Sequence, residues 1–265
     1  AGAWIVGFAT HAILDRHTHP YINYFSGWVE PGDPHTERYR SMHPFLERLI
    51  DVALLRRMRT QHPNELEFFS LVSCGSDPPE DWLSMMVAAL EGAYERAAKD
   101  RDLRARLTSA YLDSMGYYEF TSFVDEPHLA GALAREERGE IGTRWLSIIH
   151  PPNVPADLDV LNTGRTAGCH PCNSRETYSV GFLDCYESAL EESADVGRAI
   201  AAAWNSDLPV QVRMETVETS VKNWNLSDGR ATERACHKKH AAPLSLGELQ
   251  ARIRASIREG RGGRV

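Results

Sequence analysis

Two apolar segments, each carrying a histidine and an acid four residues apart, constrain this chain more than any other feature. His11 and Asp15 follow the apolar run AWIVGFAT, and His43 and Glu47 lie within HPFLERLIDVALL. Residues four apart share one face of an α-helix. A buried carboxylate costs several kcal/mol unless it is paired or binds a metal. Both segments are therefore predicted to be buried helices whose polar groups meet one another or a cation.

Apolar residues recur at helical spacing along most of the chain. The expected helices cover residues 4–18, about 44–59, 80–98, 103–123, 126–138, 180–204 and about 245–258. Pro20 is expected to end the first helix, because a proline pushes the residue before it out of the helical region. Residues 209–221 contain β-branched residues and could form an isolated strand. Residues 145–180, crowded with Pro, Gly and Asn, are predicted to be irregular.

These elements predict an all-α fold. We expect a single helical domain over residues 1–265, a multi-helix bundle with a long irregular loop region around 145–180. The 42% hydrophobic content is sufficient for a core. No apolar stretch approaches the roughly 20 residues of a membrane span. A formal net charge of −8 argues against nucleic-acid binding, which demands a basic surface.

Both ends of the chain are expected to depart from this domain. The start, AGAWIVGF, has no initiator Met and begins within a helix, so we expect a missing N-terminal segment. No signal-peptide pattern is visible, which favours a cytoplasmic location. Residues 259–265 are expected to be a basic, disordered tail. The C-terminal part of the chain carries a basic run, Arg252, Arg254, Arg258, Arg261 and Arg264. An anionic membrane surface would attract this run, so peripheral membrane contact is a further expectation.

The two histidine segments predict a metal centre within the bundle. Two facing helices that each offer an imidazole and a carboxylate can hold two or three ions, and nitrogen and oxygen ligands suit Zn²⁺. The expected ligands are His11, Asp15, His19, His43 and Glu47, and Asp15 is also the candidate general base. The alternative is a network of buried hydrogen bonds that ties the two helices together.

The cysteines allow a second site. Cys169 and Cys172 form a C-x2-C motif, and Cys236 and His240 lie near the C-terminus. These four residues form either a structural zinc site or ordinary loops. The total of five cysteines is odd and does not suggest a disulfide-stapled scaffold.

Aromatic residues follow the first histidine segment. Tyr21, Tyr24, Phe25 and Trp28 are expected to be core residues, with an apolar mouth for a lipid as the alternative. His35 and His62 are expected to lie at the surface.

The stretch GFATHAILDRHTHPYI, followed by HPFLERLID, resembles the bacterial zinc-dependent phospholipase C family, and most closely its uncharacterised bacterial branch. The similarity is strongest over residues 7–55 and fainter over 178–204. It implies an all-α fold and a cluster of zinc ions. Such ions polarise a phosphodiester and lower the pKa of a water that attacks phosphorus. Family members supply further ligands from an N-terminal segment, which is expected to be missing here.

The resemblance also implies roles for individual residues. Each of the two histidine–acid pairs would ligate one zinc ion. Either His19 or His17 would be a third ligand, and Asp51 would orient a ligand histidine.

The predicted function is a zinc-dependent phosphoesterase, similar to phospholipase C, that hydrolyses a small-molecule or lipid phosphodiester. The alternative from another class is a non-catalytic helical binding module with a structural or vestigial metal site. A helical phosphohydrolase acting on nucleotides is less favoured, because that family centres on a His-Asp dipeptide and the chain contains none.

Overall fold

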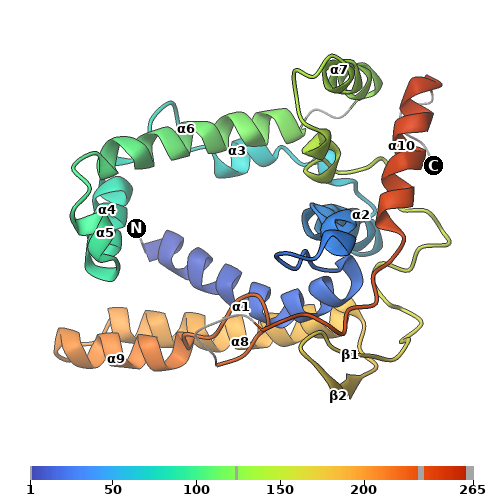
Figure 1. Ribbon diagram of the computed structural model, residues 1–265. Coiled ribbons are helices and arrows are strands. Elements are labelled where there is room, and N and C mark those ends of the chain that lie inside the picture. The colour runs from blue at the N-terminus through green and yellow to red at the C-terminus, as the bar shows by residue number, and fades with distance from the viewer. Residues whose placement is uncertain (1, 123–124, 232–235, 261–265) are drawn as a thin grey trace.

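The computed structural model describes residues 2–122, 125–231 and 236–260, and most of them are helical, which confirms the all-α class (Figure 1). The α-helices within these ranges are α1 (Gly2–Ser26), α2 (Met42–Arg59), α3 (Phe68–Val72), α4 (Glu80–Ala93), α5 (Glu95–Ala98), α6 (Leu103–Ser122), α7 (Glu126–Glu137), α8 (Phe182–Trp204), α9 (Val210–Val221) and α10 (Leu246–Arg258). Between them lie the 3₁₀-helices η1 (Pro34–Tyr39), η2 (Pro63–Glu65) and η3 (Thr143–Ser147), and the antiparallel strands β1 (Gly168–His170) and β2 (Asn173–Tyr178). None of the helices described is both long and apolar enough to cross a membrane.

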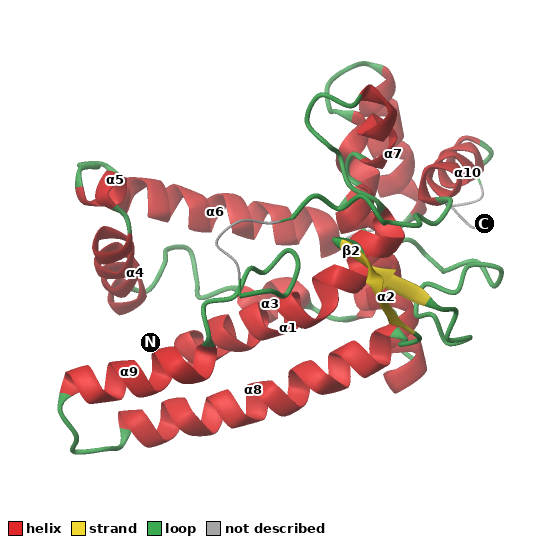
Figure 2. Ribbon diagram, turned by 60° about the horizontal axis from the view of Figure 1, so that its bottom comes forward, coloured by secondary structure: helices red, strands yellow, loops and turns green. Residues whose placement is uncertain are grey.

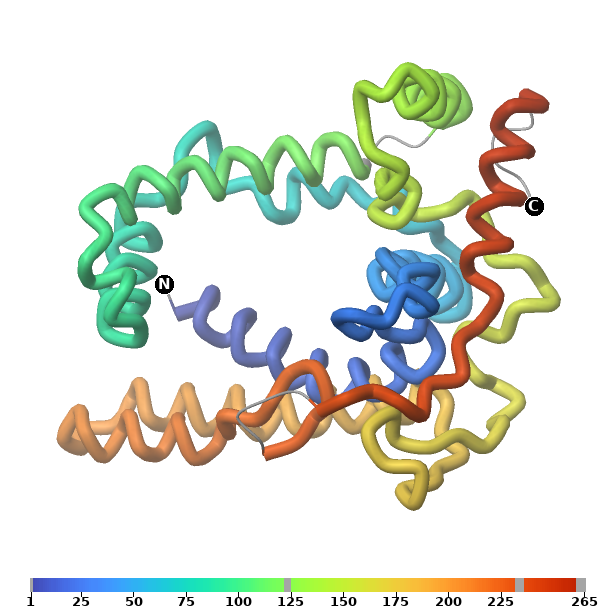
Figure 3. Tube along the Cα trace, viewed as in Figure 1, coloured from blue at the N-terminus to red at the C-terminus, as the bar shows by residue number. Residues whose placement is uncertain are grey.

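Two arms of helices extend from one end of the molecule (Figures 1 and 3). One arm consists of α1, α8 and α9, and α9 runs back along α8 (Figure 2). The other arm consists of α3 to α6. The arms meet where the indole of Trp4 in α1 contacts that of Trp82 in α4, with 6.2 Å between ring centroids. Helices α2, α7 and α10 lie at the common end.

Two clusters of buried apolar side chains correspond to this layout. The larger cluster lies at the common end, where Phe45, Leu46 and Leu49 of α2 are fully buried among residues of α1, α10 and η3. The smaller cluster joins Ile13 of α1 to Val196 of α8, and α9 packs against it. Because α1 contributes to both clusters, it connects the arm to the common end.

Helix α1 differs from its prediction in two respects. It continues through Pro20 to Ser26, so the expected end at residue 18 is wrong. Burial of Tyr21 and Ile22 in the larger cluster, at roughly 1.5–3 kcal/mol each, offsets the about 3 kcal/mol that an interior proline costs. The helix is also not buried on all sides, because Phe8 is 61% exposed.

Residues 210–221 form helix α9, and the strand considered for this segment is absent. Val210, Met214, Val217 and Val221 repeat at a spacing of three or four residues, and the last two pack against the smaller cluster. This helical period outweighs the strand propensity of valine. The other predicted helices agree with the structure within a few residues, except that 80–98 is divided at Tyr94 into α4 and α5.

The remaining expectations concern the loop region and the C-terminus. Residues 145–180 are irregular as predicted, apart from the β1–β2 hairpin and the end of η3. Arg254 and Arg258 of α10 pair with Glu136 and Glu137 of α7, so part of the basic run joins two helices. Residues 261–265 of the expected tail lie outside the described residues.

An ion-pair network holds α1 against α8 and α9. The guanidinium of Arg16, a residue only 4% exposed, lies 2.7 Å from a carboxylate oxygen of Glu192 in α8. Lys222, which follows α9, pairs with the same oxygen, and His17 contacts the other one at 2.7 Å. Burial alone would raise the pKa of Glu192, but hydrogen bonds from Lys222, His17 and Arg16 lower it to about 2.

We expect this network to weaken in acid. Because the pKa of Glu192 in the folded protein lies below its ordinary 4.5, the carboxylate contributes stability above pH 4.5 that is lost as the pH falls toward about 2. In urea unfolding at a series of pH values, Glu192→Gln should be less stable than the native protein at neutral pH and should lose less stability below pH 4.5. Glu187→Gln, at an exposed position of α8, is the control. Parallel pH curves for Glu192→Gln and the native protein would contradict the assignment.

Candidate metal centre

Three of the predicted ligands meet where α1 passes α2. The ligand atoms of His19, His43 and Glu47 all lie within 4.8 Å of one another. His43 Nε2 is 3.1 Å from Glu47 Oε1, and His19 Nε2 is 3.6 Å from the same oxygen. The two imidazole rings stand edge to face, with centroids 4.9 Å apart. We call these three residues the His19–His43–Glu47 cluster.

The other two predicted ligands extend the cluster along α1. Asp15 Oδ1 is 3.6 Å from His19 Nε2, and Asp15 Oδ2 is 3.5 Å from His11 Nε2. The side chain of Asp15 is 18% exposed and that of His11 is 68% exposed. The five residues therefore form a row that begins at the surface with His11 and ends in α2.

The second nitrogen of each imidazole in the cluster is held by a neighbour. His19 Nδ1 donates to the carbonyl oxygen of Leu226 at 2.8 Å, and His43 Nδ1 donates to Asn23 Oδ1 at 3.0 Å. The Asn23 amide is itself fixed, because its Nδ2 donates to the carbonyl oxygen of Ser227 at 2.7 Å. We therefore assign the Nδ1–H tautomer to both rings, which leaves each Nε2 facing Glu47.

A positive charge between the two imidazoles and the carboxylate would stabilise the cluster. Neutral rings with protonated Nδ1 would turn two Nε2 lone pairs toward Glu47, and a proton or a metal ion removes this repulsion. Burial opposes the protonation of His19, but the hydrogen bond to Glu47 and the charges of Asp15 and Glu47 raise its pKa. Burial would also raise the pKa of Glu47, whereas hydrogen bonds from His19 and His43 lower it to about 2.

This donor set fits zinc. Zn²⁺ binds imidazole nitrogen and carboxylate oxygen, and ligand histidines usually donate their other ring nitrogen to an oxygen of the protein. His19 and His43 both do so, through Leu226 and Asn23. Asp15 is the nearest further carboxylate on α1, at the partly exposed side of the cluster.

Two neighbouring residues, His17 and Asp51, lie away from the cluster. His17 points to α8, where its Nε2 contacts Glu192, so His19 is the histidine that joins the cluster. Asp51 contacts His150 at 3.0 Å and Arg48 at 3.2 Å, so the expectation that it orients a histidine of the cluster is wrong. Eight residues rotate a helix face by about 80°, which carries Asp51 away from His43.

The cysteines and aromatic residues also have definite places. Cys172 and Cys236 form a disulfide, a pairing that was not predicted from the sequence and that takes both sulfurs from the four-residue zinc site. The thiol of Cys169 instead contacts the carbonyl oxygen of His240 at 3.7 Å. Tyr21 is 2% exposed and Phe25 packs against the larger cluster, so the core role is confirmed for these two.

Asn23 is a residue of the site that was not predicted, although the sequence contains a signal for it. His11, Asp15, His19 and Asn23 follow one another at four-residue intervals, so Asn23 continues the polar stripe of α1 by one turn. The carbonyl groups of Leu226 and Ser227 carried no such signal, because any residue can supply a backbone oxygen.

Comparison of the chain with protein-family models, with curated proteins and with solved structures finds no match. The geometry of the cluster is therefore the main basis for a functional proposal.

Proposed function

We propose that this protein is a zinc-dependent phosphoesterase that hydrolyses a small-molecule or lipid phosphodiester, as in phospholipase C-like enzymes. One observation carries the proposal. Two imidazoles, each with its Nδ1–H held by a protein oxygen, present Nε2 to one carboxylate oxygen of Glu47. The likeness of residues 7–55 to the zinc-dependent phospholipase C family supports the same chemistry.

The residues divide into holding and proton-transfer roles. His19, His43 and Glu47 would hold one zinc ion, and Asp15 with His11 would hold a second at the exposed end of the row. Zinc bound there would stabilise charge on a phosphoryl oxygen and lower the pKa of water. Asp15, partly exposed beside the cluster, is placed to accept a proton from the attacking water at a carboxylate oxygen.

Elemental analysis and hydrolysis of bis(p-nitrophenyl) phosphate test this proposal. The intact protein should contain about two zinc ions per chain, as in two-metal phosphoesterases. Asp15→Ala and His43→Ala should lose zinc and hydrolysis, whereas His35→Ala, at an exposed position in η1, should retain both. A folded native protein without zinc and without hydrolysis would contradict the proposal.

A second candidate is a non-catalytic helical binding module. It is favoured by the fact that each acid already has two histidine partners, with His19 shared between Glu47 and Asp15. Full zinc occupancy with no open coordination position, together with no hydrolysis, would identify this structural role.

A further inference from the structure

The loop of residues 225–230 supplies both backbone oxygens that orient the cluster. Leu226 accepts from His19, and Ser227 accepts from Asn23, which in turn holds His43. The loop closes on itself, because the amide of Asn225 donates to the carbonyl of Arg230 at 2.8 Å. Its position therefore decides which way both imidazoles of the cluster face.

The loop is pressed tightly against α1. Gly229 adopts a positive φ of 68°, and a Cβ added there would collide with the carbonyl oxygen of Arg16. That oxygen lacks its usual helical donor, because Pro20, four residues later, has no N–H. The loop thus covers α1 at the point where the helix is locally open, one turn from His19.

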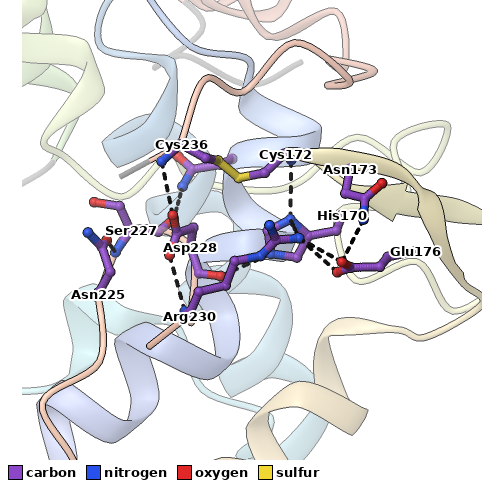
Figure 4. Close-up of a disulfide and its surroundings, with 10 residues drawn as sticks. His170, Cys172, Asn173, Glu176, Asn225, Ser227, Asp228, Arg230 and Cys236 are labelled. Atoms are coloured by element: carbon purple, nitrogen blue, oxygen red, sulfur yellow. Dashed lines mark hydrogen bonds and ion pairs between the residues drawn. A yellow bond between two sulfur atoms is a disulfide. The ribbon is translucent and has the colours of Figure 1, made fainter. Parts of the chain in front are cut away.

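Asp228 connects this loop to both halves of the Cys172–Cys236 disulfide (Figure 4). Asp228 is only 1% exposed, and its Oδ2 accepts from the amide of Cys236 at 3.0 Å. Its carbonyl oxygen accepts from His170 Nε2 at 2.9 Å, and His170 Nδ1 accepts from the amide of Cys172 at 3.2 Å. A short chain of hydrogen bonds therefore leads from each cysteine to the residue next to Ser227.

Both cysteines of the disulfide are partly exposed. A dithiol reductant can therefore attack one sulfur through its thiolate and break the S–S bond. The second thiol of the reductant then attacks this mixed disulfide and releases the second protein thiol. Two electrons and two protons pass to the protein, which gains two thiols, and the reductant becomes a disulfide.

We propose that the Cys172–Cys236 disulfide is a redox control of the candidate metal centre. The oxidised form holds the 225–230 loop in place and keeps both imidazoles oriented for a cation. Reduction by a dithiol releases the link between the hairpin and the loop, and cation affinity at the His19–His43–Glu47 cluster falls. This inference rests on the proposed zinc site.

Zinc titration of the full chain tests the proposal, with calorimetry as the readout. Cys172→Ser/Cys236→Ser should bind zinc about 10- to 100-fold more weakly than the oxidised native protein, the range found when groups that orient metal ligands are lost. Cys74→Ser/Cys185→Ser, which removes two free thiols, is the matched control and should bind like the native protein. The double-serine variant is preferred to chemically reduced native protein, because the freed thiols of Cys172 and Cys236 lie beside Asp228 and can themselves bind zinc.

Two further measurements separate the possible failures. The oxidised native protein should contain three reactive thiols after denaturation, Cys74, Cys169 and Cys185, and a count of five would overturn the proposal. In metal-free protein, hydrogen exchange of the amides in residues 225–230 should quicken on reduction while α2 stays protected. Equal zinc affinity of the folded oxidised protein and the folded double-serine variant overturns the redox control alone. Absence of zinc binding in both forms overturns the proposed function and this inference with it.

Discussion

Replacing Glu47 with glutamine is expected to lower the zinc affinity of the protein by about 100-fold or more, because loss of a ligand should reach the upper end of the effects seen for groups around a metal. Both imidazoles of the cluster face this carboxylate, at 3.1 and 3.6 Å. Glutamine keeps the shape of the side chain but removes the charge that balances a cation and offers an amide nitrogen that cannot bind it.

Calorimetric titration with zinc measures this effect. Glu37→Gln is the matched control, since Glu37 is an exposed residue of η1 that pairs with Arg40. It should bind zinc like the native protein. If Glu47→Gln retains native zinc affinity and native helical content, then Glu47 is not a ligand. Zinc must then bind to the residues of α1 without it.

Replacing Arg16 with methionine should lower the free energy of unfolding by about 3–5 kcal/mol, the usual consequence of removing one partner of a buried ion pair. The guanidinium contacts Glu192 and the carbonyl oxygen of Val221, and it lies 5.5 Å from the ring centroid of Trp224. One side chain thereby links α1 to α8 and to the end of α9. Methionine retains the apolar stem but leaves the carbonyl oxygen of Val221 without this donor and Glu192 with only Lys222 and His17 as partners.

Urea unfolding at neutral pH gives the measurement. Arg252→Met, at an exposed position of α10, should change stability by less than about 0.5 kcal/mol, as is usual for surface sites. A loss below about 1 kcal/mol for Arg16→Met would mean that the pair behaves like an exposed one.

The part of the site that could be predicted from sequence is the part set by a single helix. His43 and Glu47 lie one turn apart on α2, so their proximity follows from helical geometry alone. The same holds for Asp15 and His19 on α1. The two pairs meet because Tyr21 and Ile22, directly after His19 and Pro20, are buried in the same cluster as Phe45 and Leu46 of α2.

The parts that could not be predicted depend on contacts between distant segments. Leu226 and His19 are 207 residues apart, and their contact uses a backbone oxygen that every residue has. The Cys172–Cys236 pair joins residues 64 apart, and five cysteines permit many pairings. Pro20 was misleading for the same reason, because the burial that keeps α1 helical beyond it comes from the rest of the chain.

The position of Pro20 has a consequence for partial unfolding. Ile13, on its N-terminal side, belongs to the smaller cluster, whereas Tyr21, on the other side, belongs to the larger one. The proline is also the point in α1 where separating the two halves breaks the fewest backbone hydrogen bonds. A subglobal opening of the α1–α8–α9 arm would therefore stop at this boundary. Such an opening would separate Asp15 and His19 from His43 and Glu47, which would remain on a folded unit. The candidate metal centre would therefore be lost under conditions in which the rest of the molecule is still folded.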